Sequence, residues 1–232
     1  TTRVLEIGCG EGMNLTGFAA AYPNALFEGF DLAETAIARG QALIEKAGLR
    51  NIRLAAKDVL EAQVSISPGS FDYIIAHGVY AWVPKAVRVA IMQLIGHALS
   101  PDGVAYVSYN SLPGGYFRMA MRDMLLHEVS EITDANAKLA ATHAFLKKLA
   151  ETDSRGHIAV EHFRLLAEDM LNSHSSVLFH DELGEVFAPQ SLTDVVRAAE
   201  GAGLRYLSDG EHVRLFEGFL EPGDEGDGDP HR

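Results

Sequence analysis

The chain has 232 residues, of which 47% are hydrophobic and 22% charged, which is typical of a globular protein and unlike a disordered chain or a coiled coil. The chain has 19 Lys and Arg and 32 Asp and Glu, which gives a formal charge of −13. A chain this acidic lacks the basic surface that non-specific phosphate binding needs, so we expect no nucleic-acid partner. No stretch approaches the roughly 20 apolar residues of a membrane helix, so no membrane insertion is expected, and the single cysteine, Cys9, excludes an intramolecular disulfide and fits a cytoplasmic location.

Short β-rich runs alternate with helical patterns through the first half of the chain. The patterns predict strands at residues 4–7, 26–30, 52–56, 71–76 and 103–109, and helices at residues 14–22, 33–47 and 84–99. Strands separated by helices imply a parallel sheet that is covered on both faces. Right-handed crossovers then place the carboxyl ends of all strands, and therefore the ligand site, at one edge. Because the chain starts at Thr1, directly before the first strand, we expect a piece of a longer protein.

The pattern becomes helical after residue 110. It predicts helices within residues 116–150, with a break near Asp134, and at residues 158–171 and 191–203, a linker at residues 151–156, an irregular segment at residues 177–187, and β-like runs at residues 205–207 and 213–220. The fold class expected is therefore α/β: a Rossmann-like, doubly wound, mostly parallel sheet with a closing antiparallel strand pair and a helical insert.

Three segments follow from this fold class. Residues 1–110 and 190–220 are expected to form the core, and residues 111–189 the helical insert, which would overhang the ligand edge as a lid or as a regulatory or substrate region. Residues 221–232, rich in Gly, Asp, Glu and Pro, are expected to be a disordered acidic tail.

A glycine-rich loop joins the first predicted strand to the first helix. It contains Gly8, Gly10 and Gly12, and its backbone N–H groups are expected to point at a ligand in the crevice. The spacing G-x-G-x-G differs from the G-x-G-x-x-G of nicotinamide cofactors, which disfavours a dehydrogenase. Glu6, inside the preceding strand, is a carboxylate that is costly to bury unless it holds polar groups of the turn or a cationic ligand.

Two acids follow the next two strands. Asp31 lies where a carboxylate can accept both hydroxyls of a ribose. Asp58 could accept from an exocyclic amine while the neighbouring Val59 packs on a purine face. Each acid alone is also a common solvated turn residue, and the position at the strand ends is what favours binding.

Together these residues resemble class I S-adenosylmethionine-dependent methyltransferases. The resemblance implies S-adenosylmethionine as cofactor, S-adenosylhomocysteine as product, and a cofactor site made by Glu6, Gly8, Cys9, Gly10, Gly12, Asn14, Asp31, Leu32, Asp58, Val59, His77 and Gly78. A second resemblance is carried by residues 76–84 (AHGVYAWVP), 109–114 (YNSLPG) and 180–183 (HDEL), which look like bacterial methyltransferases with a methyltransferase regulatory domain. That group includes lysine methyltransferases of outer-membrane proteins, so the insert would correspond to the regulatory region.

Methyl transfer needs a nucleophile held in line with the sulfonium in a site without water. The candidate catalytic residues, all expected after the fourth and fifth strands, are His77, Tyr80, Trp82, Tyr109 and Asn110. A structural role for His77 and a packing role for Tyr80 and Trp82 remain alternatives of similar weight.

The expected function is methylation of an amine such as a protein lysine, with a protein or small molecule as acceptor. A catalytically silent S-adenosylmethionine-binding regulatory module and a small-molecule O-methyltransferase remain alternatives. We expect no metal site, because His174, His180 and Asp181 match no familiar ligand spacing. Cys9 is more easily explained as a small residue in a crowded turn than as a nucleophile.

Overall fold

The structure, a computed structural model, describes residues 1–210. Within them, one parallel sheet has the strand order β3-β2-β1-β4-β5. The strands are β1 (Arg3–Ile7), β2 (Leu26–Asp31), β3 (Ile52–Ala56), β4 (Phe71–Ala76) and β5 (Leu99–Val107). The predicted α/β class and parallel pairing are confirmed.

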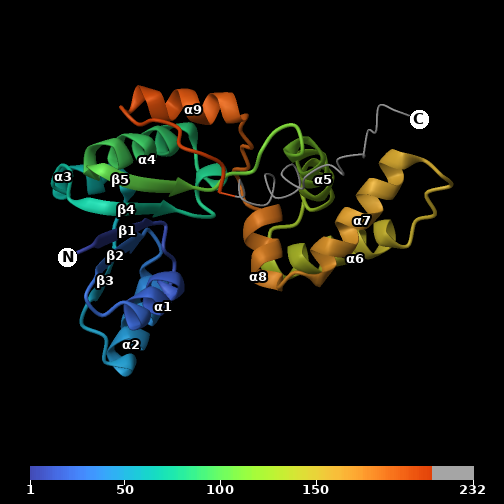
Figure 1. Cartoon of the computed structure of the whole chain (residues 1–232). Helices are drawn as coiled ribbons and strands as arrows, with labels where there is room; N and C mark the ends of the chain where they lie inside the picture. Colours follow the sequence, from blue (N-terminus) through green and yellow to red (C-terminus); the bar gives the residue numbers. More distant parts are fainter. Residues whose placement is uncertain (211–232) are drawn as a thin grey trace, which may run out of the picture.

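Helices cover both faces of the sheet (Figure 1). On one face lie α3 (Val59–Ser65), α4 (Lys85–Ala98) and α9 (Leu192–Gly201), and on the other lie α1 (Met13–Ala21) and α2 (Glu34–Ala47). Each face has its own core: Ile74 and Ile95 belong to the first cluster, and Leu15 and Ile37 to the second. The sheet is therefore buried on both sides, as its apolar strands require.

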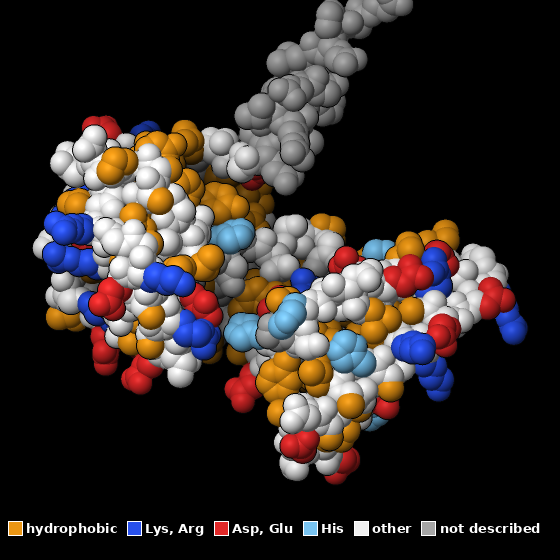
Figure 2. Space-filling view, turned by 90° about the horizontal axis from the view of Figure 1, so that it is seen from below, with side chains coloured by type: hydrophobic (Ala, Val, Ile, Leu, Met, Phe, Trp, Pro, Cys, Tyr) orange, Lys and Arg blue, Asp and Glu red, His pale blue; other side chains and the backbone are white. Residues whose placement is uncertain are grey.

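A second group of helices lies beyond the carboxyl ends of β4 and β5 (Figure 1). It contains α5 (Gly115–Glu128), α6 (Ala135–Ala150), α7 (Ile158–Asn172), α8 (Ser175–Val177) and a π-helical turn at Leu178–Glu182. We call α5 to this turn the helical region. Its own apolar core consists of Met121, Leu125, Leu146, Ala167, Met170 and Leu178. Seen from below, the sheet and the helical region form two lobes, with hydrophobic and histidine side chains gathered where the lobes meet (Figure 2).

Helix boundaries follow local sequence signals in most places. The predicted break near Asp134 is confirmed, since the Asp134 carboxylate accepts a hydrogen bond of 2.8 Å from the Ala137 N–H and caps α6. The prediction of an irregular segment from residue 177 was wrong at its start, because Leu178 packs into the core of the helical region and the chain coils there. Helix α3 was not predicted.

The chain enters and leaves the helical region at one place. The Gln190 N–H donates to the Asn110 carbonyl at 2.9 Å, and the Leu112 N–H donates to the Gln190 carbonyl at 2.9 Å. Close by, the Ala188 N–H donates to the Ala81 carbonyl at 2.8 Å. These bonds tie both connecting segments to the sheet's carboxyl edge.

The predicted closing strand pair is not seen. Within residues 1–210, the segment 205–207 has no ladder to a neighbouring strand, which a β-strand requires. Its expected partner at residues 213–220 and the expected acidic tail at residues 221–232 lie outside the described residues. Among the helices of the described part, none is long and apolar enough to cross a membrane.

Candidate active site

The glycine loop connects β1 to α1 as predicted. Gly8, Gly10 and Gly12 have φ angles of +71°, +55° and +68°, a backbone conformation that side chains with a Cβ adopt only under strain. A Cβ added at Gly10 would have no atom within 4 Å, so the loop leaves space on the outside of the turn. The loop thus provides a surface of bare backbone at the carboxyl edge of the central strand.

The expectation that the loop's N–H groups point at a ligand was wrong for four of them, because these donate to other groups of the protein. The N–H groups of Gly8 and Cys9 both donate to the Phe30 carbonyl, at 2.9 and 3.1 Å, and the Gly12 N–H donates to the Cys9 carbonyl at 2.8 Å. The Gly10 N–H donates to Asp31 Oδ2 at 2.9 Å. The loop folds back onto the end of β2, because β1 and β2 pair side by side up to Ile7 and Phe30.

Asp31 is partly buried at the end of β2. Its Oδ2 accepts from the Gly10 N–H and its Oδ1 accepts from the Ala33 N–H at 2.8 Å. Each carboxylate oxygen has two lone pairs, so one on each remains for a further donor such as a ribose hydroxyl. The adjacent Leu32 is 73% exposed, which leaves an apolar surface beside this acid for a ligand to cover.

Glu6 is buried in β1, 5% exposed, directly before the glycine loop. Its Oε1 accepts from Asn14 Nδ2 at 3.1 Å, and its Oε2 has no hydrogen-bond partner among the described residues. Burial raises the pKa of Glu6, against the lowering effects of Asn14 and of the nearby His77. A buried acceptor without a donor fits a ligand that brings an N–H group or a positive charge to the loop.

Asp58 and Val59 lie at the end of β3. Asp58 caps α3, since its Oδ1 accepts from the Leu60 N–H at 2.8 Å. Val59 is 9% exposed and belongs to the sheet's core, so only a small part of it is left for a purine.

His77 and Gly78 follow β4 at the same edge. The Gly78 N–H donates to Ser108 Oγ at 2.8 Å, and the His77 ring lies 5.9 Å from the Tyr106 ring, centroid to centroid. Sequence reasoning missed Ser108 and Tyr106, although both lie at the end of the predicted fifth strand. They show that the loop after β4 is held by the end of β5.

Tyr80 and Trp82 are packed side chains. Tyr80 is 3% exposed within the core, and burial raises the pKa of its hydroxyl, so it is a poor base at neutral pH. The Trp82 and Phe187 ring centroids are 4.7 Å apart, and the guanidinium carbons of Arg118 and Arg122 lie 5.1 and 5.8 Å from the Trp82 ring. This placement favours the packing alternative for both residues.

Tyr109 and Asn110 lie where the chain leaves β5. Burial, followed by the negative charge of Asp209, raises the pKa of Tyr109. The Asn110 backbone carbonyl binds Gln190, so this residue helps to fix the start of the helical region. Burial and the charges of Glu6 and Asp31 raise the pKa of Cys9 to about 12, which makes its thiol a poor nucleophile.

The structure therefore places two hydrogen-bonded pairs around the β1 loop, Asp31 with Gly10 and Glu6 with Asn14, and sets His77 near Glu6. Trp82 belongs instead to a stack with the helical region. Within residues 1–210, no three His, Cys, Asp or Glu side chains gather closely enough to hold a metal ion.

Comparison with known proteins identifies the family. A family model described as "Methyltransferase domain" matches residues 1–164. The uncharacterized protein RP028 of Rickettsia prowazekii is 35% identical over 189 residues, which cover 80% of this chain and 74% of that protein. The tRNA (guanine-N(7)-)-methyltransferase of Leifsonia xyli is 30% identical over 129 residues, 52% of this chain and 56% of that enzyme.

A solved structure is similar over nearly the whole chain. PKMT2 from Rickettsia typhi in complex with AdoHcy is 32% identical, with a TM-score of 0.80, over 90% of this chain. The match covers 40% of the PKMT2 chain, so this sequence spans less than half of that protein. The family model, the relatives and the sheet with its glycine loop agree: the chain belongs to the methyltransferase-domain family and has the class I fold of S-adenosylmethionine-dependent methyltransferases.

Proposed function

We propose that this methyltransferase transfers a methyl group to the side-chain amine of lysine in a protein. The observation that carries the proposal is the similarity to PKMT2, which covers 90% of this chain. A match of that extent includes most of the helical region as well as the sheet. The similarity to the tRNA enzyme covers only 52% of the chain, so it gives less support to an RNA acceptor.

The residues at the carboxyl edge fit S-adenosylmethionine. We assign the ribose to the free lone pairs of Asp31, the adenine to the surface formed by Leu32 and Asp58, and the positively charged amino group to Glu6 Oε2. The bare backbone at Gly10 leaves room for the ligand. When bound, the cofactor supplies an electrophilic methyl group on a sulfonium.

The chain's part in the reaction is to position the amine and to remove its proton. His77 is exposed at the edge beside Glu6, and we assign one of its ring nitrogens as acceptor of the amine proton. Tyr109 is assigned to line the amine site with its ring. Its raised pKa keeps its hydroxyl protonated, so it is not the group that accepts the amine proton. The helical region beyond the strand ends is assigned to the acceptor side.

The test is a search for methylated products by mass spectrometry. Candidate proteins are incubated with S-adenosylmethionine and this chain, in parallel with its longer parent, and a gain of about 14 Da per methyl is located by fragmentation. Lysine-acetylated copies of the same proteins serve as control. Methylation only at unmodified lysine supports the proposal. Transfer to a hydroxyl, or cofactor binding without any transfer to protein, contradicts it.

A further inference from the structure

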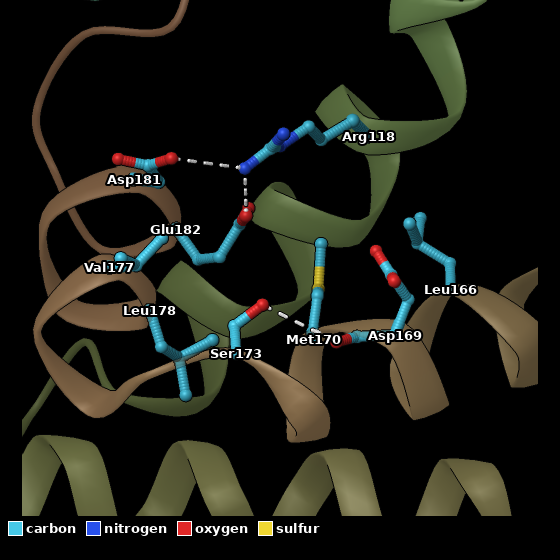
Figure 3. Close-up of a pocket in the computed structure, with 9 residues that line it drawn as sticks. All are labelled: Arg118, Leu166, Asp169, Met170, Ser173, Val177, Leu178, Asp181 and Glu182. Atoms are coloured by element: carbon cyan, nitrogen blue, oxygen red, sulfur yellow. Dashed lines mark hydrogen bonds and ion pairs between the residues drawn. The ribbon is translucent and has the colours of Figure 1, made fainter. Parts of the chain in front are cut away.

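A cavity lies inside the helical region, away from the glycine loop. It measures about 180 Å³ and lies between α5, α7 and the turn that follows α8 (Figure 3). Its lining residues are Arg118, Leu166, Asp169, Met170, Ser173, Val177, Leu178, Asp181 and Glu182. None of them belongs to the cofactor site described above.

The charged residues that line this cavity are mostly acidic. Three carboxylates, on Asp169, Asp181 and Glu182, accompany one cation, Arg118. The Arg118 guanidinium donates to Glu182 Oε1 and lies 3.5 Å from Asp181 Oδ2. The guanidinium of Arg122, outside the lining, also acts on Glu182 and Asp181. Two guanidinium groups against three carboxylates leave a net charge of one negative unit, so the cavity still favours a cation.

Glu182 presents a buried acceptor that lacks a donor. The residue is 3% exposed, and its Oε2 has no hydrogen-bond partner in the described part of the chain. Burial raises the pKa of Glu182, against the opposing charge of Arg118. A ligand N–H group at Oε2 would complete the hydrogen bonding of this carboxylate.

The remaining wall is apolar and the space is small. Leu166, Met170 and Leu178 face the cavity together with the carboxylates (Figure 3). A chain of methylene groups that ends in an ammonium matches both surfaces, whereas a nucleotide is too large. On the other side of Arg118, the guanidinium carbon lies 5.1 Å from the Trp82 ring, so the Arg118 side chain and the Trp82–Phe187 stack stand between the cavity and the sheet.

We propose that this cavity binds a lysine side chain of the protein acceptor, at a position other than the lysine that is methylated. The inference rests on the proposed function, because it takes the acceptor to be a protein. The ammonium group donates to Glu182 Oε2 and faces Asp169 and Asp181, and the methylene groups lie on Met170 and Leu178. The cavity thereby selects acceptors that carry a second lysine.

The test uses methyl NMR of the methionines. The chain has six, of which Met170 lines the cavity and Met13 begins α1 directly after the glycine loop. The probe is a single lysine with a blocked backbone, Nα-acetyl-lysine methylamide, compared with the same compound acetylated at Nε. The lysine probe is expected to shift the Met170 methyl resonance, and the acetylated probe, which lacks the charge, is not.

Two variants and one control make the assignment specific. Glu182→Gln is expected to weaken binding of the lysine probe by roughly tenfold, the effect of losing one charged hydrogen bond. Asp169→Asn, at an exposed position, is expected to weaken it by a smaller factor. Glu185→Gln removes an exposed acid three residues beyond Glu182 and should leave the affinity unchanged. If Glu182→Gln does not fold, the affinity of Asp169→Asn for the lysine probe decides whether the cavity binds lysine.

The inference is overturned if both probes shift Met170 equally, or if neither variant changes the affinity. Titration of the same sample with S-adenosylhomocysteine tests the cofactor site separately, through the Met13 methyl, and the mass-spectrometric search described above tests the methylation of lysine. A response at Met13 without one at Met170 overturns the lysine cavity alone. A response at Met170 without one at Met13 supports the cavity and contradicts the cofactor site.

Discussion

Asp31 Oδ2 accepts a hydrogen bond of 2.9 Å from the Gly10 N–H, so the acid assigned to the ribose also holds the glycine loop in place. The loop and the acid come from different strands, β1 and β2, which lie next to each other in the sheet. The proposed ribose contact and the geometry of the loop therefore depend on the same carboxylate.

Replacement of Asp31 by Asn tests this coupling. The amide keeps one acceptor oxygen and places N–H groups where the second was, so either the Gly10 or the Ala33 contact is lost along with the ribose contact. We expect the affinity for S-adenosylhomocysteine, measured by calorimetry, to fall by roughly tenfold or more, with a melting temperature a few degrees lower. Glu34→Gln, at an exposed acid in the first turn of α2, is the control. An unchanged affinity for Asp31→Asn would contradict the assignment.

Glu6 gives the ligand-free protein a specific pH dependence. Because the native pKa of Glu6 lies above its ordinary value of 4.5, folding favours the protonated carboxyl group. This contribution to stability is fully present below pH 4.5, and it is lost as the pH rises through the native pKa. Glu6→Gln stays neutral. We therefore expect wild type to lose stability relative to Glu6→Gln as the pH rises above about 4.5, in urea unfolding without ligand.

The matched control for this experiment is Glu45→Gln, an exposed acid on α2, whose difference from wild type should stay constant with pH. The same Glu6→Gln variant should bind S-adenosylhomocysteine more weakly at neutral pH, since the ligand's amino group loses its charged partner. A pH-independent difference, or full affinity, would disagree with the buried carboxylate described above.

Gly40 allows α2 to approach the glycine loop. A Cβ added there would lie 2.2 Å from the Glu11 carbonyl oxygen, so Gly40→Ala must displace either the helix or the loop. We expect a loss of about 1–3 kcal/mol in the free energy of unfolding and weaker cofactor binding. Gly17→Ala is the contrasting variant: this exposed α1 glycine has no atom within 4 Å of the added Cβ, and the change should stabilise by about 0.5–1 kcal/mol. Equal effects of the two substitutions would be inconsistent with the structure.

Trp82 is the single tryptophan of the chain and reports on the contact between the sheet and the helical region. Phe187→Ala removes the ring that lies 4.7 Å from it, so we expect its fluorescence emission to move to longer wavelength as water reaches the indole. The affinity for S-adenosylhomocysteine should change by less than about twofold, because the stack lies outside the cofactor site. Phe179→Ala, at an exposed ring outside the stack, should leave the emission unchanged. A large loss of cofactor affinity in Phe187→Ala would instead place Trp82 at the site.

The sequence predicted most of the features that depend on neighbouring residues. The alternation of strands and helices, the glycine loop and the cap at Asp134 are such features, because each is encoded within a few residues. Helix α3 could have been found too: Asp58 precedes it and Glu61 follows three residues later, a spacing typical of a helix start.

Contacts between distant parts of the chain could not be predicted from the sequence. The residues around Trp82 give no sign that it packs against Phe187, and those around Arg118 give no sign that it pairs with Glu182. Both contacts depend on the tertiary packing of distant segments. The use of the loop's N–H groups by Phe30 likewise depends on the register between β1 and β2. The packing of Trp82 could not be predicted for this reason, since its partners Phe187, Arg118 and Arg122 are all remote in the sequence.

The two backbone hydrogen bonds that join Gln190 to Asn110 and Leu112 have one further consequence. Because both crossings of the chain meet there, a short linker joining residue 110 to residue 190 would excise the whole helical region without cutting a sheet strand. The sheet and its glycine loop could thus keep their architecture while different helical segments are exchanged upon them. Under the proposed function, acceptor choice could then diversify separately from methyl-donor binding.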